Sequence, residues 1–185
     1  MPSSRMSEIS TRCSAIQAEL LELNNTHAEE TSYLSADEWH SLIDKAYSAK
    51  CIDNAALLIA FDGDADYANT NFKWFSARFD QFVYIDRIIV SSKLRGTGAA
   101  QMLYRDLIDR AGRTDHEWLV CEINRDPPNP VSDAFHRKLG FIEVGQARLT
   151  ERHKTVRYLA LNIRQSNFIG PSILCEGILC EDKPN

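Results

Sequence analysis

Several features that would define a class of protein are missing from this sequence of 185 residues. No stretch reaches the roughly 20 consecutive apolar residues that a membrane-spanning helix needs, so we expect no membrane partner. Residues 1–12 are polar and lack the apolar run and cleavage site of a secretory signal. No internal repeat or low-complexity tract is present. These absences favour one globular domain in the cytoplasm.

A surplus of basic residues is also missing. The 21 Lys and Arg residues are outnumbered by 26 Asp and Glu residues, which gives a net charge of -5. Binding to phosphate backbones draws on a Lys and Arg surplus, so we expect no nucleic-acid partner. Mild acidity would suit a cationic substrate, but it is also a common route to solubility. The charge alone leaves both interpretations open.

Neither the cysteines nor the acidic residues form a metal-binding pattern. The five cysteines, Cys13, Cys51, Cys121, Cys175 and Cys180, include no C-x-x-C pair, and Cys175 and Cys180 have no nearby histidine at zinc-like spacing. Residues 62–66 resemble the start of a calcium loop but lack the later glycine and the terminal glutamate. We therefore expect free thiols of a reducing compartment and no metal.

The hydrophobic pattern alternates between strands and helices, which is typical of an α/β fold with a mixed sheet. Strands are expected over residues 16–23, 55–61, 82–90, 118–123, 141–149 and 155–163. Helices are expected over residues 35–46, 98–110 and 129–139, the first opened by a capping box of Ser35 and Glu38. We expect a disordered lead at 1–14, one domain at 15–165 and a tail at 166–185.

The most informative segment is Arg95-Gly96-Thr97-Gly98-Ala99-Ala100, between an expected strand and an expected helix. Such a turn aims free backbone N–H groups and the positive helix end at one point, which makes an anion site. The segment is not a Walker loop, because no Gly-Lys-Ser/Thr follows, and it lacks the three glycines of a dinucleotide fingerprint. Taken alone, a glycine pair here could also be only a tight turn.

With this loop the chain resembles the GNAT N-acetyltransferase superfamily. The signature Arg/Gln-x-x-Gly-x-Gly/Ala is filled by Arg95, Gly98 and Ala100, and Lys138-Leu139-Gly140-Phe141 matches a second signature, a helix that ends in a Lys-x-Gly-Phe type turn. The resemblance covers residues 84–163 well and residues 16–61 loosely. Residues 121–130 are similar to a subgroup of predicted bacterial acetyltransferases.

The resemblance implies a mostly antiparallel central sheet that is flanked by helices and splayed at the acyl-CoA site. It implies transfer of an acetyl (acyl) group from acetyl-CoA, as cosubstrate, to a primary amine by direct attack in a ternary complex. The acceptor would be a small molecule or a peptide, and a homodimer is expected by analogy. The alternative is a non-catalytic module that binds or senses acyl-CoA. The implied coenzyme A contacts are Ile88, Ile89, Val90, Arg95, Gly96, Thr97, Gly98, Ala99, Ala100, Asn129 and His136.

Glu122 is the candidate catalytic base, since many members of that family keep a glutamate at this strand end. A carboxylate after the apolar run 118–121 is costly to bury unpaired. It therefore either faces the cleft as the base or pairs with Arg87 or Arg125. Cys121 should point away from Glu122, into the core.

His136 is the candidate acid, at the position where most members carry a tyrosine that protonates the departing thiolate. An imidazolium is a competent acid, but His136 could instead be a hydrogen-bonded helix residue that only touches coenzyme A. Tyr104 and Tyr84 are further candidate donors. Backbone N–H groups of Ile89 or Val90 could stabilise the developing oxyanion.

Residues 24–35 and 62–79 are the expected acceptor loops, where carboxylates and aromatic rings gather. They could hold a cationic amine, or they could be solvated loops over a core cluster. Only one strand is apparent between residues 61 and 91. We therefore expect the aromatic segment 72–79, a short helix or irregular lid, to replace one strand of a hairpin, and we carry over no acceptor residue.

Overall fold

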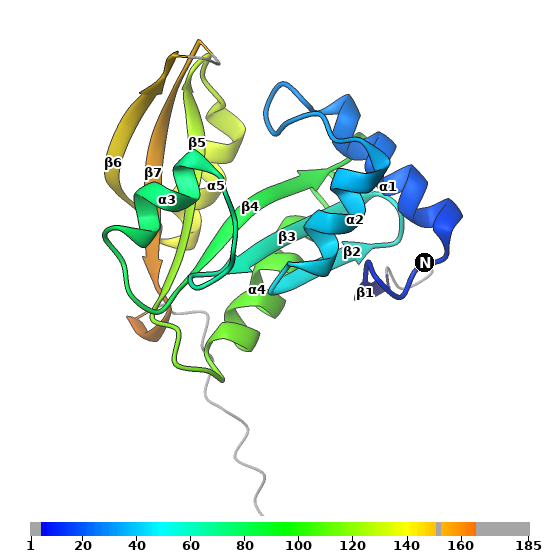
Figure 1. Cartoon of the computed structure of the whole chain (residues 1–185), viewed down its shortest axis with the longest axis horizontal. Coiled ribbons are helices and arrows are strands. Elements are labelled where there is room, and N and C mark those ends of the chain that lie inside the picture. Colours follow the sequence, from blue (N-terminus) through cyan, green and yellow to red (C-terminus); the bar gives the residue numbers. More distant parts are fainter. Residues whose placement is uncertain (1–4, 151–152, 166–185) are drawn as a thin grey trace, which may run out of the picture.

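A seven-stranded sheet with helices on both faces forms the molecule (Figure 1). The computed structural model describes residues 5–150 and 153–165. The strands lie in the order β1-β2-β3-β4-β5-β7-β6, and only β4 and β5 pair in parallel. The predicted mixed, mostly antiparallel α/β fold is therefore confirmed. The strands are β1 (Met6–Glu8), β2 (Ser48–Ile52), β3 (Ala56–Asp62), β4 (Phe82–Val90), β5 (Trp118–Asp126), β6 (Ile142–Leu149) and β7 (Lys154–Asn162).

The helices bury two separate hydrophobic cores, one on each face of the sheet. Residues of α1, α2 and α3 pack with one face of the strands, and residues of α4 and α5 pack with the other. Figure 1 shows α1 and α2 over β2–β4, and α3 beside β5 and β7. The helices are α1 (Ser14–Thr26), α2 (Ala36–Asp44), α3 (Thr70–Ser76), α4 (Ala99–Ala111) and α5 (Pro130–Leu139).

Two helix starts form as their sequences predict. The Ser35 hydroxyl accepts a hydrogen bond from the Glu38 N–H at 3.3 Å, and Glu38 accepts one from the Ser35 N–H at 2.8 Å, which completes the capping box of α2. The Asn129 side chain accepts from the Ser132 N–H at 3.1 Å and caps α5. That helix ends at Gly140, whose φ of 92° suits glycine best.

Three expectations about the first half of the chain are wrong. Residues 16–23 belong to helix α1, because Leu20 and Asn24, four apart, are fully buried on one helical face. Within the lead that we expected to be disordered, β1 pairs with β2. Strand β2 completes a hairpin with β3, so α3 is an addition between β3 and β4 and replaces no strand.

The sheet opens between its two central strands. Strand β4 pairs with β5 only where residues 82–84 lie beside residues 118–120. Beyond this point β4 remains paired with β3, and β5 remains paired with β7, while the two central strands diverge (Figure 1). The expected splay is therefore present, and it leaves one backbone edge of β4 free to bind a ligand.

Some expectations concern residues or features outside this sheet. Cys13 is exposed, Cys51 and Cys121 are buried, and all three are free thiols. Cys175, Cys180 and the tail at 166–185 lie outside the described residues. Within residues 5–150 and 153–165, no helix is long and apolar enough to cross a bilayer, and no cluster of three His, Cys, Asp or Glu side chains could hold a metal ion.

Candidate active site

The turn before α4 has the geometry of an anion site. Gly96 and Gly98 have φ values of 76° and 89°, which glycine adopts without strain. A side chain at Gly96 would meet nothing within 4 Å, and one at Gly98 would meet only the Gln101 side chain at 3.8 Å. No side-chain hydrogen bond caps α4 at Gly98. The N–H groups of the first helical turn therefore face an open surface.

A cavity of about 690 Å³ lies over this turn and along β4. Thr97 does not line it, since its hydroxyl donates back to the Leu94 carbonyl at 2.7 Å. The other predicted coenzyme A contacts do line it, namely Ile88, Ile89, Val90, Arg95, Gly96, Gly98, Ala99, Ala100, Asn129 and His136. Other residues that line the cavity were not predicted from the sequence, among them Leu94, Gln101, Val131, Ser132, Phe135 and Lys138.

The free edge of β4 supplies backbone donors to the same cavity. The Ser91 N–H bonds to the Ala55 carbonyl at 2.8 Å, across the β3 side of the strand. Because hydrogen-bonding direction alternates along an antiparallel strand, the Ile89 N–H also points toward β3. The N–H groups of Ile88 and Val90 point into the gap. Of the two oxyanion donors considered from the sequence, Val90 has the suitable direction.

Glu122 lies just beyond the last paired residues of β4 and β5, on the β5 side of the gap. Its carboxylate accepts hydrogen bonds from the Tyr84 hydroxyl at 2.8 and 3.1 Å. The Asn71 side-chain amide donates to it at 2.8 Å. Asn71 is itself oriented by the Tyr158 hydroxyl, which donates to its carbonyl oxygen at 3.0 Å. Glu122 is thus held by two donors, Tyr84 of β4 and Asn71 of α3, and Tyr158 of β7 orients the second of them.

Burial, together with the negative charge of Asp86, raises the pKa of Glu122 to about 7. Hydrogen bonds from Tyr84 and Asn71 act in the opposite direction, because they stabilise the carboxylate. A carboxyl group with a pKa near neutrality is suited to accept a proton at physiological pH and to release it again.

The pairing of Glu122 with Arg87 or Arg125, which the sequence left open, does not occur. Arg87 pairs with Asp86 at 2.6 Å, and Arg125 donates to Gln146 at 2.5 Å. Cys121 faces away from Glu122 into the core beneath α4 and α5, as predicted. Burial holds the pKa of its thiol well above the usual range, so it is a poor nucleophile.

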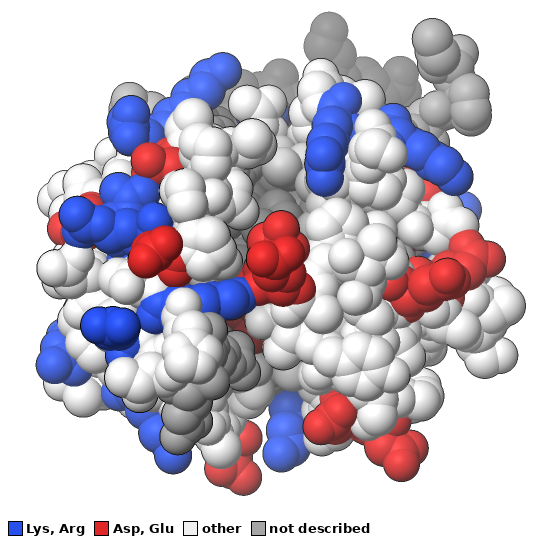
Figure 2. Space-filling model, turned by 90° about the horizontal axis from the view of Figure 1, so that it is seen from above, with Lys and Arg blue, Asp and Glu red and all other residues white. Residues whose placement is uncertain are grey.

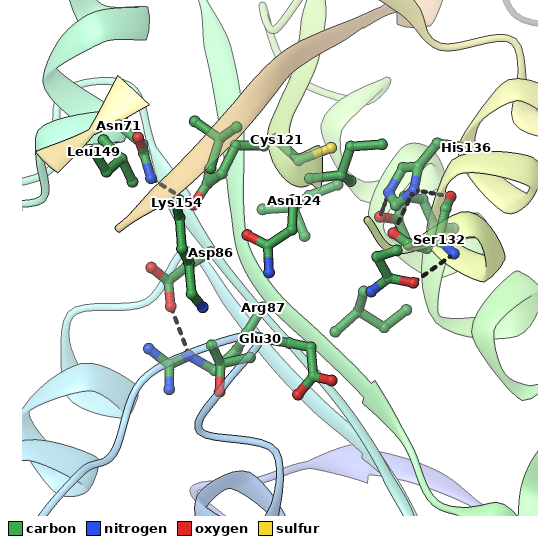
Figure 3. Close-up of a pocket in the computed structure, with 18 residues that line it drawn as sticks. Glu30, Asn71, Asp86, Arg87, Cys121, Asn124, Ser132, His136, Leu149 and Lys154 are labelled. Atoms are coloured by element: carbon green, nitrogen blue, oxygen red, sulfur yellow. Dashed lines mark hydrogen bonds and ion pairs between the residues drawn. The ribbon is translucent and has the colours of Figure 1, made fainter. Parts of the chain in front are cut away.

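A smaller cavity of about 100 Å³ passes through the gap and contains Glu122 (Figure 3). Its wall combines Asn71, Asp86 and Glu122 on one side of the sheet with Tyr104, Cys121 and His136 on the other. Figure 2 shows the molecule from above the view of Figure 1. A hollow runs between two lobes there, and acidic side chains lie next to a basic one. The residues that border both cavities are Glu30, Thr31, Ile88, Asn129, Ser132 and His136.

His136 is buried at this junction, and both of its ring nitrogens are engaged. Nδ1 lies 2.8 Å from the Ser132 carbonyl, which can only accept, so Nδ1 carries the proton. Nε2 then accepts from the Tyr104 hydroxyl at 2.6 Å. Burial lowers the pKa of His136 and raises that of Tyr104. At neutral pH the pair therefore consists of a neutral imidazole and a neutral phenol.

Several polar residues of the smaller cavity were not named from the sequence, namely Asn71, Asp86, Asn124, Ser132 and Lys154. Asn71 falls within the expected acceptor loop 62–79, between the helix cap Asn69 and Phe72. Lys154 is the first residue of β7. It has the pattern of any exposed strand end, so no sequence signal marks it.

Comparison with known proteins identifies the family of the chain. A model of the acetyltransferase (GNAT) family matches residues 20–141. The chain therefore belongs to the GNAT acetyltransferase family, whose members include bacterial N-acetyltransferases. No curated protein sequence matches the chain.

Three solved structures show the likeness of the fold. A ribosomal-protein-S18-alanine N-acetyltransferase from Escherichia coli is 17% identical, with a TM-score of 0.62, over 86% of this chain and 93% of that one. An N-acetyltransferase from Staphylococcus aureus Mu50 is 14% identical, with a TM-score of 0.62, over 86% and 98%. The yncA protein of Salmonella typhimurium, solved with its cofactor acetyl-CoA, is 18% identical, with a TM-score of 0.60, over 86% and 93%.

Proposed function

We propose that this acetyltransferase moves the acetyl group of acetyl-CoA to a primary amine by direct attack in a ternary complex. The observation that carries the proposal is the meeting of two cavities in the gap between β4 and β5. The larger cavity begins at the uncapped start of α4, and the smaller one contains Glu122. Two substrates bound there would meet beside Ile88, Asn129 and His136, which border both cavities.

The turn at residues 95–100 fits the pyrophosphate of coenzyme A. Its glycines leave the surface open, and the first N–H groups of α4 provide partial positive charge. Bound acetyl-CoA supplies an activated thioester. The free N–H groups of β4 at Ile88 and Val90 hold the arm and receive the carbonyl oxygen, whose negative charge grows during attack.

Glu122 prepares the acceptor. An amine arrives as an ammonium ion, and the Glu122 carboxylate removes one proton from it and passes that proton to solvent. The nitrogen then forms a bond to the acetyl carbon while the carbon–sulfur bond breaks. The nitrogen loses a second proton and the thiolate gains one, so each turnover releases one proton.

We assign delivery of the proton to the thiolate to His136 together with Tyr104. Both line the smaller cavity, and their hydroxyl-to-imidazole hydrogen bond places a proton at the junction of the cavities. The same bond is the observation that favours the alternative, an acyl-CoA-binding module without catalysis. In that case His136 would serve only to pack α5 against α4.

Coenzyme A binding and amine acetylation together test this function. We expect calorimetry to detect coenzyme A and acetyl-CoA binding, and a thiol-reactive dye to report free coenzyme A when primary amines are added. Gly98→Asp should weaken coenzyme A binding by about tenfold or more, because its charge faces the pyrophosphate. Gly98→Asn is the matched control, since asparagine tolerates the same positive φ without a charge.

The outcomes separate the two functions. Binding with release of coenzyme A in the presence of amines supports the enzyme. Binding without turnover on a broad panel of primary amines supports the sensing module. No binding by the wild type, or equal binding by Gly98→Asp and Gly98→Asn, contradicts the assignment of the cofactor site.

A further inference from the structure

The smaller cavity contains two cationic side chains, and only one of them is neutralised. Arg87 pairs with Asp86 at 2.6 Å, and both side chains are 3% exposed. Arg87 also donates to the Asn24 side chain at 2.6 Å and to the Ser32 hydroxyl at 3.4 Å. This buried pair is satisfied within the protein, so it adds no net charge that a ligand could use.

Lys154 is the other cation, and its charge is not neutralised. It lies at the start of β7, half-buried, and extends into the cavity near Asp86 and Asn124 in Figure 3. Its ammonium donates one hydrogen bond, to the Glu29 carbonyl. Among residues 5–150 and 153–165, no carboxylate forms an ion pair with it. A lysine has three donors, so two of them and the charge remain for a ligand.

Asn124 adds a second unused donor beside Lys154. Strand register places Asn124 opposite Val156, and Lys154 lies two residues before Val156 on the same face of β7. The Asn124 side chain lines the cavity and makes no hydrogen bond to any of the described residues. An ammonium and an amide N–H that converge on one space are the donors that a carboxylate accepts.

Acidic side chains line the same cavity. Glu122 lies in the gap, Asp86 lies near Lys154, and the exposed Glu30 borders both cavities (Figure 3). An ammonium group is attracted to these carboxylates, whereas a substrate carboxylate is attracted to Lys154. Lys154 also donates to the Glu29 carbonyl and so joins β7 to the loop after α1. The cavity itself is small, at about 100 Å³.

From this arrangement we infer that the acceptor is a small molecule with a carboxylate in addition to its primary amine, as in a free amino acid. Lys154 and Asn124 bind the carboxylate and turn the amine toward Glu122. This inference rests on the proposed acetyl transfer and names the substrate class of that site. A cavity of about 100 Å³ has room for a small molecule rather than for several residues of a peptide, so its size favours the small molecule.

Matched acceptor pairs test the inference. Free amino acids are compared with their own carboxamides, and with simple alkylamines, as acceptors for acetyl-CoA. We expect kcat/KM for an acid to exceed that of its amide by about tenfold or more, as for a charge-assisted hydrogen bond. Lys154→Met should remove this preference by weakening the acid alone, and Lys154→Arg should restore part of it. Lys45→Met, at an exposed position outside both cavities, is the control.

Each outcome decides a separate question. If acids and amides are acetylated equally well by the wild type, the substrate class is wrong while acetyl transfer stands. If Lys154→Met weakens acids and amides by the same factor, Lys154 only holds the loop and the inference is overturned. If coenzyme A binds but no amine is acetylated, the proposed function fails and the inference fails with it.

Discussion

Glu122 owes its chemistry to the residues around it rather than to its place in the chain. A carboxylate this deeply placed would be neutral at pH 7 if burial acted alone, since burial disfavours the charged form. Tyr84 and Asn71 donate to it and bring its pKa back to about 7. The balance allows a proton to be taken up and released within one cycle.

Loss of one hydrogen-bond donor to Glu122 should therefore shift the pH profile of kcat/KM to higher pH. Asn71→Ala removes a hydrogen bond that lowers the pKa of Glu122, so more of the carboxylate is protonated at pH 7. We expect the rate at pH 7 to fall about three- to tenfold and to recover as the pH rises. The pH profile of kcat/KM measures this. Ser76→Ala, an exposed residue on the same helix, should leave the profile unchanged, and an unmoved profile for Asn71→Ala would contradict the account.

A separate prediction concerns the His136–Tyr104 pair. His136→Gln keeps a polar side chain at the junction but cannot titrate, and Tyr104→Phe removes the shared proton with little change in volume. If this pair protonates the thiolate, both variants should lose about 10²-fold in kcat and keep their coenzyme A affinity. Steady-state kinetics and calorimetry measure the two quantities. Full activity in both variants would reduce the pair to a packing role.

At the scale of elements, α3 supplies Asn71 and is held in place by an aromatic stack. Trp74 stacks on Tyr158 with 4.1 Å between ring centroids, and the Arg78 guanidinium lies 4.2 Å from the Trp74 ring. Gly145 in β6 makes room for this ring, because a Cβ there would lie 2.6 Å from Trp74. The site therefore depends on a glycine in a different strand.

Gly145→Ala should displace Trp74 and loosen α3. We expect a loss of about 1–3 kcal/mol in the free energy of unfolding, as for overpacking elsewhere, together with a lower kcat. Denaturant titration and kinetics measure these effects. Trp74→Phe removes the crowding ring atoms, so the double variant should regain stability relative to Gly145→Ala. A fully stable Gly145→Ala variant would show that α3 does not depend on this contact.

Helices and strands could be predicted where the local sequence pattern fits only one kind of secondary structure. Strand β4 has a β-branched and aromatic pattern, and helix α5 has a clear cap at Asn129 and a clear end at Gly140. Both elements formed as predicted. The prediction for residues 16–23 failed because so short a mixture of apolar and polar residues fits either period, and packing on the sheet decides for a helix. Strand β2 contains Lys50 and lies next to a helix, so its pattern was too weak to distinguish from a loop.

At the scale of the whole molecule, the sequence located one substrate site better than the other. The larger cavity is built mainly from two segments, within residues 88–101 and 129–138, so motifs could identify many of its residues. The smaller cavity gathers residues from α3, α4, α5, from β4 to β7 and from the loop after α1. Such a site exists only after folding, which is why Asn71 and Lys154 were not predicted. The homodimer and the cytoplasmic location stay predictions.

In the proposed reaction, the cofactor binds in the larger cavity and the base Glu122 lies in the smaller one. The most direct test is the pH dependence of acetyl transfer in the wild type and in Glu122→Gln, with coenzyme A affinity measured in parallel. We predict a wild-type rate that rises with pH through about 7, as Glu122 loses its proton. The variant should be slower by about 10²-fold or more, insensitive to pH in this range, and unchanged in coenzyme A affinity. A variant as fast as the wild type, with the same pH profile, would contradict the role of Glu122 and the central claim with it.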